Sequence, residues 1–350
     1  MRIALLTYST RPRGGVVHTL ALAEALSTRG HEVTVWTLAR GGGFFRAVDE
    51  GVRLELVPFP DVPGEEVGPR ILRSIALLRA AFRPDDYDVV HAQDCISANA
   101  VDRCIRTVHH LDRFTTPELA ACHERAIVRP FAHITVSAAV AAELRAGWGL
   151  APTVIPNGVD AARFAAAEPI PQRYPYVLAV GGIEPRKGSL DLLRAYALAR
   201  RSRPDLRLVI AGGETLFDYR AYRAEWDRLA LSLDVHPEVL GPVAHDELPR
   251  WVAGAAVFAF PSTKEGFGLA AMEALAAGVP VVVRDLPVLR EVFGSAVLYG
   301  TDPPSLATAL LRAADAPDEA SRKSGRELAA AHTWSAAAAL HEQFYRRILA

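Results

Sequence analysis

The sequence predicts an α/β protein made of two doubly wound, Rossmann-like domains that face each other across a cleft. Short runs of Val, Ile and Leu alternate with helix-length amphipathic segments along all 350 residues. Runs such as VVV and LVI are apolar on both faces, as parallel strands covered by helices must be. Asn-Gly occurs only at Asn157–Gly158, and the long spacers between apolar runs argue against a hairpin protein.

Thirteen strands are expected from these apolar runs. Those of the first half are Ile3–Thr7, Val33–Thr37, Leu54–Val57, Val89–Ala92, Thr107–His109, Ile134–Val136 and Val154–Ile155. Those of the second half are Val177–Val180, Leu208–Ile210, Val239–Leu240, Val257–Phe260, Val279–Val283 and Val297–Leu298.

A linker near Ala161–Pro175 separates the two halves. After Asp160 the pattern lapses into ARFAAAEPIPQRYP, which holds three prolines, and YVLAVGG then restarts an α/β unit. We therefore expect one domain over residues 1–165 and a second over 166–334. Ligands of open α/β sheets lie at the carboxyl ends of the strands, so the cleft between two such sheets is the expected binding site.

Composition excludes several function classes. The formal net charge of −1 carries no electrostatic signal for nucleic acid. Three cysteines, Cys95, Cys104 and Cys122, form no CxxC pair and suit a reduced, cytoplasmic compartment. The apolar run in MRIALLTYST is too short for a signal peptide and predicts a strand, and no segment reaches the ~18 apolar residues of a membrane span.

The first strand leads into Gly14 and Gly15, followed by a helix with apolar positions at Val17, Leu20 and Leu26. Glycines at a helix N-terminus leave free N–H groups and the helix dipole for an anion, although they also simply permit a tight turn. A dinucleotide site is disfavoured because there is no GxGxxG, and no acidic residue follows the second strand.

His109 ends a predicted strand and would therefore face the cleft. A lone histidine is usually structural, but the position of this one favours contact with a sugar or with the reacting centre over a structural role. His110 next to it has a weaker claim to such a role.

The segment GGIEPRKG, residues 181–188, follows the first strand of the second half. Arg186 can grip a pyrophosphate by a bidentate fork and Lys187 as a point charge. The alternative is a solvated turn, because PRKG is also ordinary turn chemistry.

The segment KEGFGLAAMEALAAGVPVVVRD, residues 264–285, holds two carboxylates in an otherwise apolar run. Gly266 and Gly268 let the loop backbone approach a ligand, and a helix is predicted over Leu269–Ala277, ended by Gly278. Glu265 would lie at the loop tip. Glu273 lies one turn inside the helix, where it can accept paired hydrogen bonds from vicinal hydroxyls such as those of a ribose.

EGFGLAAME resembles the E-x7-E motif of the GT-B-fold glycosyltransferases of family 4, which are retaining enzymes that use nucleotide-sugars. The GG loop, the VH after a strand, IPNGVD and the RKG loop extend the resemblance over nearly the whole chain. It implies a metal-independent transfer from a nucleotide-diphosphate sugar to an unidentified small-molecule or lipid-linked acceptor. It also implies that the first domain receives the acceptor, that the second binds the donor, and that a C-terminal helix near 335–350 packs back on the first domain.

The resemblance also implies roles for individual residues, with His109, Glu265 and Lys187 as the catalytic set. It implies that Glu273 contacts the ribose of the donor and that Val243 lies near the base. Glu265 and the backbone of Phe267, Gly268 and Leu269 are implied to contact the transferred sugar and the diphosphate. Lys187 and the Gly15 amide are implied to contact the diphosphate. Gly14, Arg186 and Gly266 complete the expected donor site.

One position departs from the family pattern. Gly182 stands where an arginine is common, so one diphosphate cation is either missing or supplied by Arg186. A non-catalytic nucleotide-sugar-binding protein therefore remains an alternative, and so does a GT-B-type epimerase, which would use the same fold. There is no DxD and no His/Asp pair at ligand spacing, so Lys187, Arg186 and the helix N-termini are expected to supply the positive charge.

The helix PRILRSIALLRAAFRP, residues 69–84, carries arginines on both sides of an apolar stripe made by Ile71, Ile75, Leu78 and Phe82. The i, i+4, i+7, i+11 spacing is typical of a helix packed on a sheet. A core-facing helix is therefore preferred to a membrane-surface helix.

Overall fold

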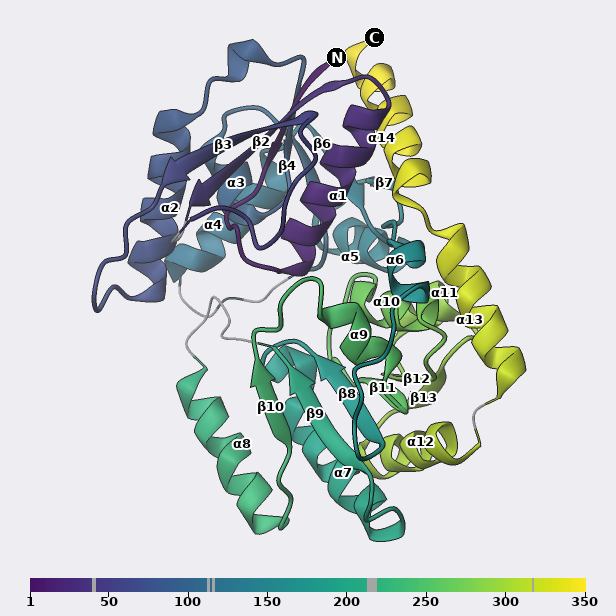
Figure 1. Cartoon of the computed structure of the whole chain (residues 1–350). Coiled ribbons are helices and arrows are strands. Elements are labelled where there is room, and N and C mark those ends of the chain that lie inside the picture. Colours follow the sequence, from purple (N-terminus) through teal and green to yellow (C-terminus); the bar gives the residue numbers. More distant parts are fainter. Residues whose placement is uncertain (40–41, 112–113, 115–116, 213–218, 317) are drawn as a thin grey trace. The chain divides into compact units, whose positions relative to one another are not determined.

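The chain folds into two compact units in this computed structural model, which describes residues 1–39, 42–111, 114, 117–212, 219–316 and 318–350. Unit 1 comprises Met1–Gly158 with Trp334–Ala350, and unit 2 comprises Val159–Thr333 (Figure 1). The boundary lies at 158/159, whereas the sequence suggested 165/166. The difference arises because α6 (Ala161–Ala165) packs on other helices of unit 2.

Unit 1 is built on a seven-stranded, wholly parallel sheet with the order β3-β2-β1-β4-β5-β6-β7. Its strands are β1 (Arg2–Leu6), β2 (Glu32–Ala39), β3 (Val52–Pro58), β4 (Val89–Ala92), β5 (Ile105–Val108), β6 (Ala132–Thr135) and β7 (Thr153–Val154). All seven predicted strands are present. β5 ends at Val108, so His109 is the first residue beyond the strand rather than its last.

Helices cover both faces of this sheet, as the doubly apolar strands predicted. They are α1 (Gly14–Thr28), α2 (Val67–Ala81), α3 (Cys95–Ala100), α4 (Pro117–Val128), α5 (Ala138–Trp148) and α14 (Trp334–Leu349), with a 3-10 turn at Pro84–Asp86. α1 and α14 lie side by side on one face, and α2, α3 and α4 gather on the other (Figure 1). The C-terminal helix therefore belongs to unit 1, although the whole of unit 2 lies before it in the chain.

The arginine-flanked helix is α2, and its apolar stripe faces the core. Ile71, Leu78 and Phe82 are buried, while Arg73 pairs with Glu65 at 2.6 Å. No helix among the described residues is long and apolar enough to cross a membrane.

Unit 2 contains a six-stranded parallel sheet with the order β10-β9-β8-β11-β12-β13. Its strands are β8 (Tyr176–Val180), β9 (Arg207–Ala211), β10 (Glu238–Gly241), β11 (Val257–Phe260), β12 (Val281–Arg284) and β13 (Leu298–Gly300). β12 begins two residues later than predicted, after Pro280, which lacks the amide donor that a ladder needs.

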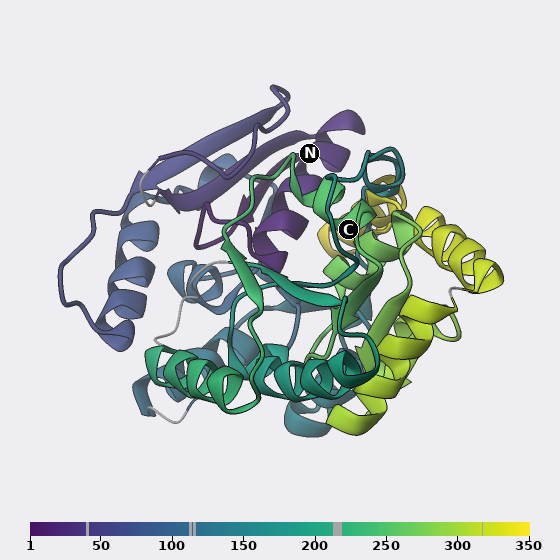
Figure 2. The same cartoon turned by 60° about the horizontal axis from the view of Figure 1, so that its bottom comes forward.

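The helices of unit 2 again form two layers. They are α6, α7 (Ser189–Ser202), α8 (Arg220–Ser232), α9 (Leu248–Ala253), α10 (Leu269–Ala276), α11 (Pro287–Phe293), α12 (Pro303–Asp315) and α13 (Glu319–Ala331), with a 3-10 turn at Pro185–Lys187. α7, α8 and α12 share one apolar cluster with the sheet, and α7 and α8 run beside each other in Figure 2. α10 packs on β11 and β12, and on α13.

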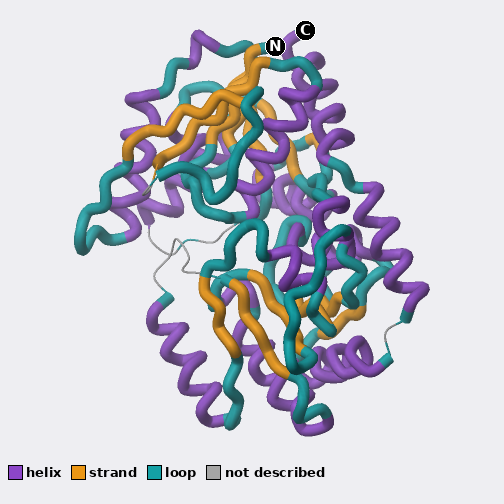
Figure 3. Tube along the Cα trace, viewed as in Figure 1, coloured by secondary structure: helices purple, strands orange, loops and turns teal. Residues whose placement is uncertain are grey.

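The strand order reverses once in each sheet, between β1 and β4 in unit 1 and between β8 and β11 in unit 2. The strands of both sheets are drawn in orange in Figure 3. Loops leave such a switch point in opposite directions and open a crevice at the carboxyl ends of the strands, where α/β proteins bind ligands. The predicted site residues of unit 2 follow β8 and β11, and His109 of unit 1 follows β5, the neighbour of β4.

Candidate functional site

In unit 2, two glycines that directly follow strands of the sheet have little room for a side chain. Gly181 has φ +129°, and a Cβ there would lie 3.3 Å from the Lys187 Cε, so the lysine stem lies across Gly181. A Cβ on Gly212 would lie 2.1 Å from the Gly181 carbonyl oxygen. Both positions require glycine because neighbouring atoms lie too close for a side chain. The absence of a side chain on Gly181 lets the Lys187 stem lie against the end of β8.

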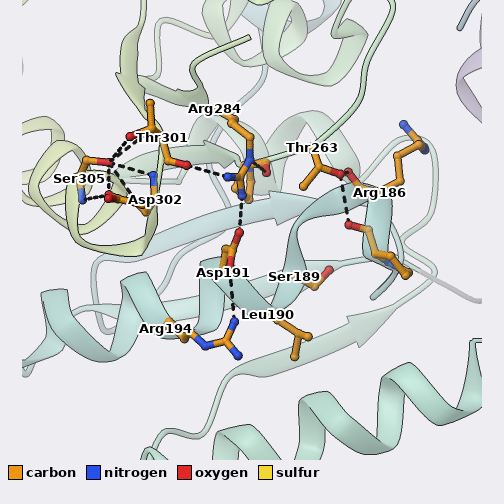
Figure 4. Close-up of polar contacts among 12 residues, drawn as sticks. Arg186, Ser189, Leu190, Asp191, Arg194, Thr263, Arg284, Thr301, Asp302 and Ser305 are labelled. Atoms are coloured by element: carbon orange, nitrogen blue, oxygen red, sulfur yellow. Dashed lines mark hydrogen bonds and ion pairs between the residues drawn. The ribbon is translucent and has the colours of Figure 1, made fainter.

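A charge cluster joins the RKG loop to the EGFG loop. Lys187 Nζ lies 2.7 Å from Glu265 Oε1, and Arg186 Nη1 lies 3.0 Å from the same oxygen. Arg186 also pairs with Glu184 at 3.1 Å. The backbone N–H of Thr263 donates to the Arg186 carbonyl at 2.8 Å, and Figure 4 shows the Thr263 hydroxyl at the same carbonyl. These contacts bring Arg186, Lys187 and Glu265 together at one edge of the sheet.

The sequence predicted that Glu265 lies at the tip of its loop. In the structure its side chain is instead packed against the neighbouring loop. Its side chain is only 10 % exposed and accepts from the two cations of the neighbouring loop. The reason lies in the fold, since β8 and β11 are adjacent strands and their following loops share one edge of the sheet.

A small cavity of about 20 Å3 lies within this cluster, bordered by Gly181, Gly182, Lys187, Ser189 and Ser262 among others. The Ser262 hydroxyl is buried and has no hydrogen-bond partner among the described residues. A buried hydroxyl normally finds a partner, so this cavity suits one water or one oxygen of a ligand. Ser262 was missed from the sequence, although its place directly after β11 and Pro261 was a usable signal.

No side chain caps the N-terminus of α10. Gly268 caps it with φ +97° and no side-chain hydrogen bond, and its first turn holds no acidic residue. Gly266 and Phe267 before it are buried, and the Phe267 ring packs 5.7 Å from the His332 ring. The loop therefore offers its backbone, and not the Phe267 side chain, to an anion.

Glu273 lies partly buried on α10 without a hydrogen bond or ion pair among the described residues. Burial raises its pKa to about 7; the charge of Arg163 opposes this and that of Asp160 adds to it. Arg163, on α6, donates to the His245 carbonyl in the loop that carries Val243. Arg163 thereby connects the surroundings of Glu273 with those of Val243, a connection that the sequence did not indicate.

In unit 1, the structure brings His109 and Gly15 together. A Cβ on Gly15 would lie 3.7 Å from the His109 Cδ2 and 3.8 Å from its Nε2. Burial lowers the pKa of His109 to about 3, so its ring is neutral at physiological pH and can donate one hydrogen bond and accept another. Gly14, by contrast, has no atom within 4 Å of such a Cβ and lies, with Gly15, within the first turn of α1 rather than before it.

Further buried histidines lie near His109 in unit 1. The His18 ring lies edge-on to His109, with centroids 4.7 Å apart, and its Nδ1 donates to the Asn157 Oδ1 at 2.8 Å. His91 bonds the Tyr345 hydroxyl at 2.8 Å and the Thr107 hydroxyl at 2.7 Å. His18 could have been suspected from its place near the glycine pair, whereas nothing local marks the others.

Comparisons with known proteins identify the family and the fold of this chain. Residues 160–324 match the family described as "Glycosyl transferases group 1", and residues 12–163 match "Glycosyltransferase Family 4". The phosphatidyl-myo-inositol mannosyltransferase of Mycobacterium tuberculosis is 32% identical over 337 residues, which cover 89% of this chain and 85% of that protein.

Solved structures show the same fold at lower identity. A sucrose-phosphate synthase from Thermosynechococcus elongatus superposes with a TM-score of 0.79 at 21% identity, over 99% of each chain. HepE of Anabaena, solved in complex with UDP and glucose, gives 0.76 at 18% identity over 98% of this chain and 99% of that one. The chain therefore belongs to the group 1, family 4 glycosyltransferases and has their GT-B fold.

Proposed function

We propose that the protein transfers a sugar from a nucleotide-diphosphate sugar to a hydroxyl acceptor with retention of configuration and without a metal ion. The observation that carries the proposal is the cluster of Lys187, Arg186 and Glu265 beside the uncapped N-terminus of α10. Fixed cations and backbone amides at one sheet edge suit a diphosphate leaving group, whose charge grows as the glycosidic bond breaks.

Unit 2 is the proposed donor domain. Lys187 and Arg186 hold the diphosphate together with the amides of Gly266, Phe267, Gly268 and Leu269. When the diphosphate takes these cations, Glu265 becomes free to accept hydrogen bonds from the transferred sugar. Glu273 receives the ribose hydroxyls, which supply the partner its carboxylate lacks, and Val243 lies near the base.

Unit 1 is the proposed acceptor domain, with His109 and Gly15 at its reactive end. The neutral His109 ring donates to a sugar hydroxyl, and the leaving phosphate assists departure of the acceptor proton. The M. tuberculosis relative bears the name of a phosphatidyl-myo-inositol mannosyltransferase. A mannosyl donor and a polyol acceptor, small or lipid-linked, are therefore the first candidates to test.

The test combines a donor panel with one variant. The purified protein is incubated with UDP-, GDP- and ADP-sugars without acceptor, and released nucleotide is measured. We expect hydrolysis of one donor, and a loss of about 100-fold or more in Lys187→Ala because one preorganised cation is worth ~3–4 kcal/mol. Lys323→Ala is the matched control, since Lys323 is an exposed lysine paired with Glu327 on α13. Near wild-type turnover in the Lys187 variant, with its fold intact by circular dichroism, would contradict the assignment.

Gly182 favours one second candidate, a nucleotide-sugar-binding protein without transferase activity. Where an arginine is common in the family, Gly182 contributes no charge to the cavity beside Lys187. Binding of a nucleotide-sugar without hydrolysis or transfer, over a panel of inositol and glycoside acceptors, would favour this candidate.

A further inference from the structure

Arg284 joins three segments at the carboxyl edge of the unit 2 sheet. It is the last residue of β12, and Figure 4 shows its guanidinium between the three. Its Nε donates to the Pro261 carbonyl at 2.9 Å, its Nη1 to the Thr301 carbonyl at 2.9 Å, and its Nη2 to Asp191 Oδ2 at 2.7 Å. The side chain is 12 % exposed.

Two of these partners lie close in the chain to the proposed donor ligands. Asp191 lies in the first turn of α7, four residues after Lys187. Pro261 is the first residue after β11 and lies four residues before Glu265. Arg284 therefore connects the chain next to the RKG segment with the chain next to the EGFG segment. The Lys187–Glu265 ion pair is a second connection between the two segments.

The two segments lie in close contact at Gly188. Gly188 has φ +64°, and a Cβ there would lie 2.3 Å from the Pro261 carbonyl oxygen and 3.2 Å from Arg284 Nη2. The same carbonyl oxygen accepts from Arg284 Nε. Ser262, whose hydroxyl borders the small cavity, follows this carbonyl directly.

Arg284 itself is unsuited to be a phosphate ligand. Asp191 compensates its charge, and each of its three nitrogens already donates to a protein oxygen. Displacing it would remove the donor from the partly buried Pro261 carbonyl and from Asp191 Oδ2.

We propose that Arg284 is a positioning residue that sets the spacing of the two diphosphate-binding loops. By fixing the Pro261 carbonyl against Gly188 and the first turn of α7, it holds Lys187 and the Ser262 hydroxyl at the separation that a diphosphate needs. The inference rests on the proposed function, because it concerns the same donor site.

The experiment compares the binding of a nucleoside diphosphate with that of the matching nucleoside. UDP and GDP are titrated calorimetrically into the wild type, and the tighter one is used for all variants, with its nucleoside measured by competition. In Arg284→Met we expect the Kd for the diphosphate to rise at least 10-fold, while the Kd for the nucleoside stays within twofold. Arg284→Lys keeps one charged donor and should recover part of the loss.

Arg290→Met is the matched control. Arg290 forms a comparable bidentate pair with Asp285 at the same edge, but it is exposed and bonds neither loop. We expect its diphosphate affinity to equal that of the wild type. Thermal midpoints are recorded for every variant, and binding is measured at least 20 °C below them.

Three results would overturn the inference. One is a lowered thermal midpoint in Arg284→Met with diphosphate affinity within twofold of wild type, which would mark the residue as merely structural. Another is an equal loss for diphosphate and nucleoside, which would show that Arg284 does not act through the phosphate loops. If Arg284→Met does not fold, the test uses Arg284→Lys and Asp191→Asn instead. An unchanged diphosphate Kd in both of these variants would also overturn the inference. Failure of the wild type to bind UDP or GDP would instead overturn the proposed function, and this inference with it.

Discussion

Glu265 and Glu273 are chemically identical side chains eight residues apart, and their surroundings give them different properties. Glu265 accepts from Lys187 and Arg186, so its charge is compensated in the free protein. Glu273 has no such partner among the described residues, and burial raises its pKa to about 7. A buried carboxylate with a raised pKa and no protein partner is a candidate for ligand binding.

This difference predicts that nucleotide binding depends on the ionisation of Glu273. Only the ionised carboxylate accepts two hydroxyl hydrogen bonds, so wild-type affinity should fall as pH drops from 8 to 6. Glu273→Gln should bind the nucleotide about 10-fold more weakly at pH 8 and depend less on pH, since the phosphate titration that remains is common to both proteins. Calorimetric titrations at pH 6, 7 and 8 measure this, and parallel pH profiles in the two proteins would contradict it.

The stability of the same variant provides its control. Because the folded pKa of about 7 exceeds the usual 4.5, the stabilisation due to the protonated form is complete below pH 4.5 and is lost as pH rises through 7. Glu273→Gln should therefore be more stable than the wild type at pH 8, by about 3 kcal/mol, and the difference should vanish near pH 4. Urea unfolding at both pH values measures it.

At the scale of the element, the helices that carry the glycine motifs begin without side-chain caps. α1, α7 and α10 start after Arg13, Gly188 and Gly268, none of which caps with its side chain. Asp94, Ser137 and Asp302 do cap α3, α5 and α12. A glycine at the N-cap costs only a few tenths of a kcal/mol relative to a capping side chain, and it leaves the first amides free for an anion.

Gly268 is the position where this design is most easily tested. Its φ of +97° is unfavourable for any other residue, and a Cβ would lie 3.0 Å from the Phe293 ring. Gly268→Ala should destabilise unit 2 by about 1–3 kcal/mol and weaken nucleotide binding by turning the first amides of α10. Chemical denaturation and calorimetry measure the two effects.

Gly14→Ala is the control for that prediction. Gly14 lies in the first turn of α1, has no positive φ and has open space around its Cβ direction. The substitution should leave stability unchanged or slightly raised. Equal losses in the two glycine variants would contradict the steric account.

At the scale of the whole molecule, the C-terminal helix completes unit 1. Tyr345 is fully buried and bonds His91, Trp334 packs 5.3 Å from the His18 ring, and Glu342 pairs with Arg29. α14 covers α1, so α1 is buried on a wider surface than its sequence indicated, with Val16 and Leu22 inside. The last residues of the chain therefore stabilise the layer that supports His109.

The buried histidines make unit 1 sensitive to acid. Burial lowers the pKa of His109 to about 3 and of His341 to about 4, and depresses those of His18 and His91 as well. Since each folded pKa lies below the usual 6.5, the stability these groups contribute is present above pH 6.5 and is lost as pH falls toward the folded values.

Burial also lowers the pKa of His31 and of His133 in the same unit. We expect the free energy of unfolding of unit 1 to fall by several kcal/mol between pH 6.5 and 5, because up to six protons are taken up on unfolding at ~1.4 kcal/mol per pH unit each. His341→Phe should lower this slope by about one proton. His236→Phe, at an exposed histidine of unit 2, should leave it unchanged. Urea unfolding across this pH range measures the slopes, and the same slope in all three proteins would contradict the prediction.

The sequence alone determined the local features of this protein. All thirteen strands could be predicted because apolar runs on both faces have few other solutions, and α10 could be predicted to begin at Leu269 and to end before Gly278. Glu273, Lys187 and the glycines were recognisable because charge or bare backbone in an apolar motif has few structural reasons.

Only the tertiary structure decided which of these residues meet. Arg284 and Asp191 are 93 positions apart, and His91 and Tyr345 are 254 apart, so no local pattern connects them. Strand order decides which loops share an edge of the sheet, and the return of α14 decides what covers α1. Such contacts arise from packing between distant segments, whose energies depend on geometry that a linear pattern of residues does not encode.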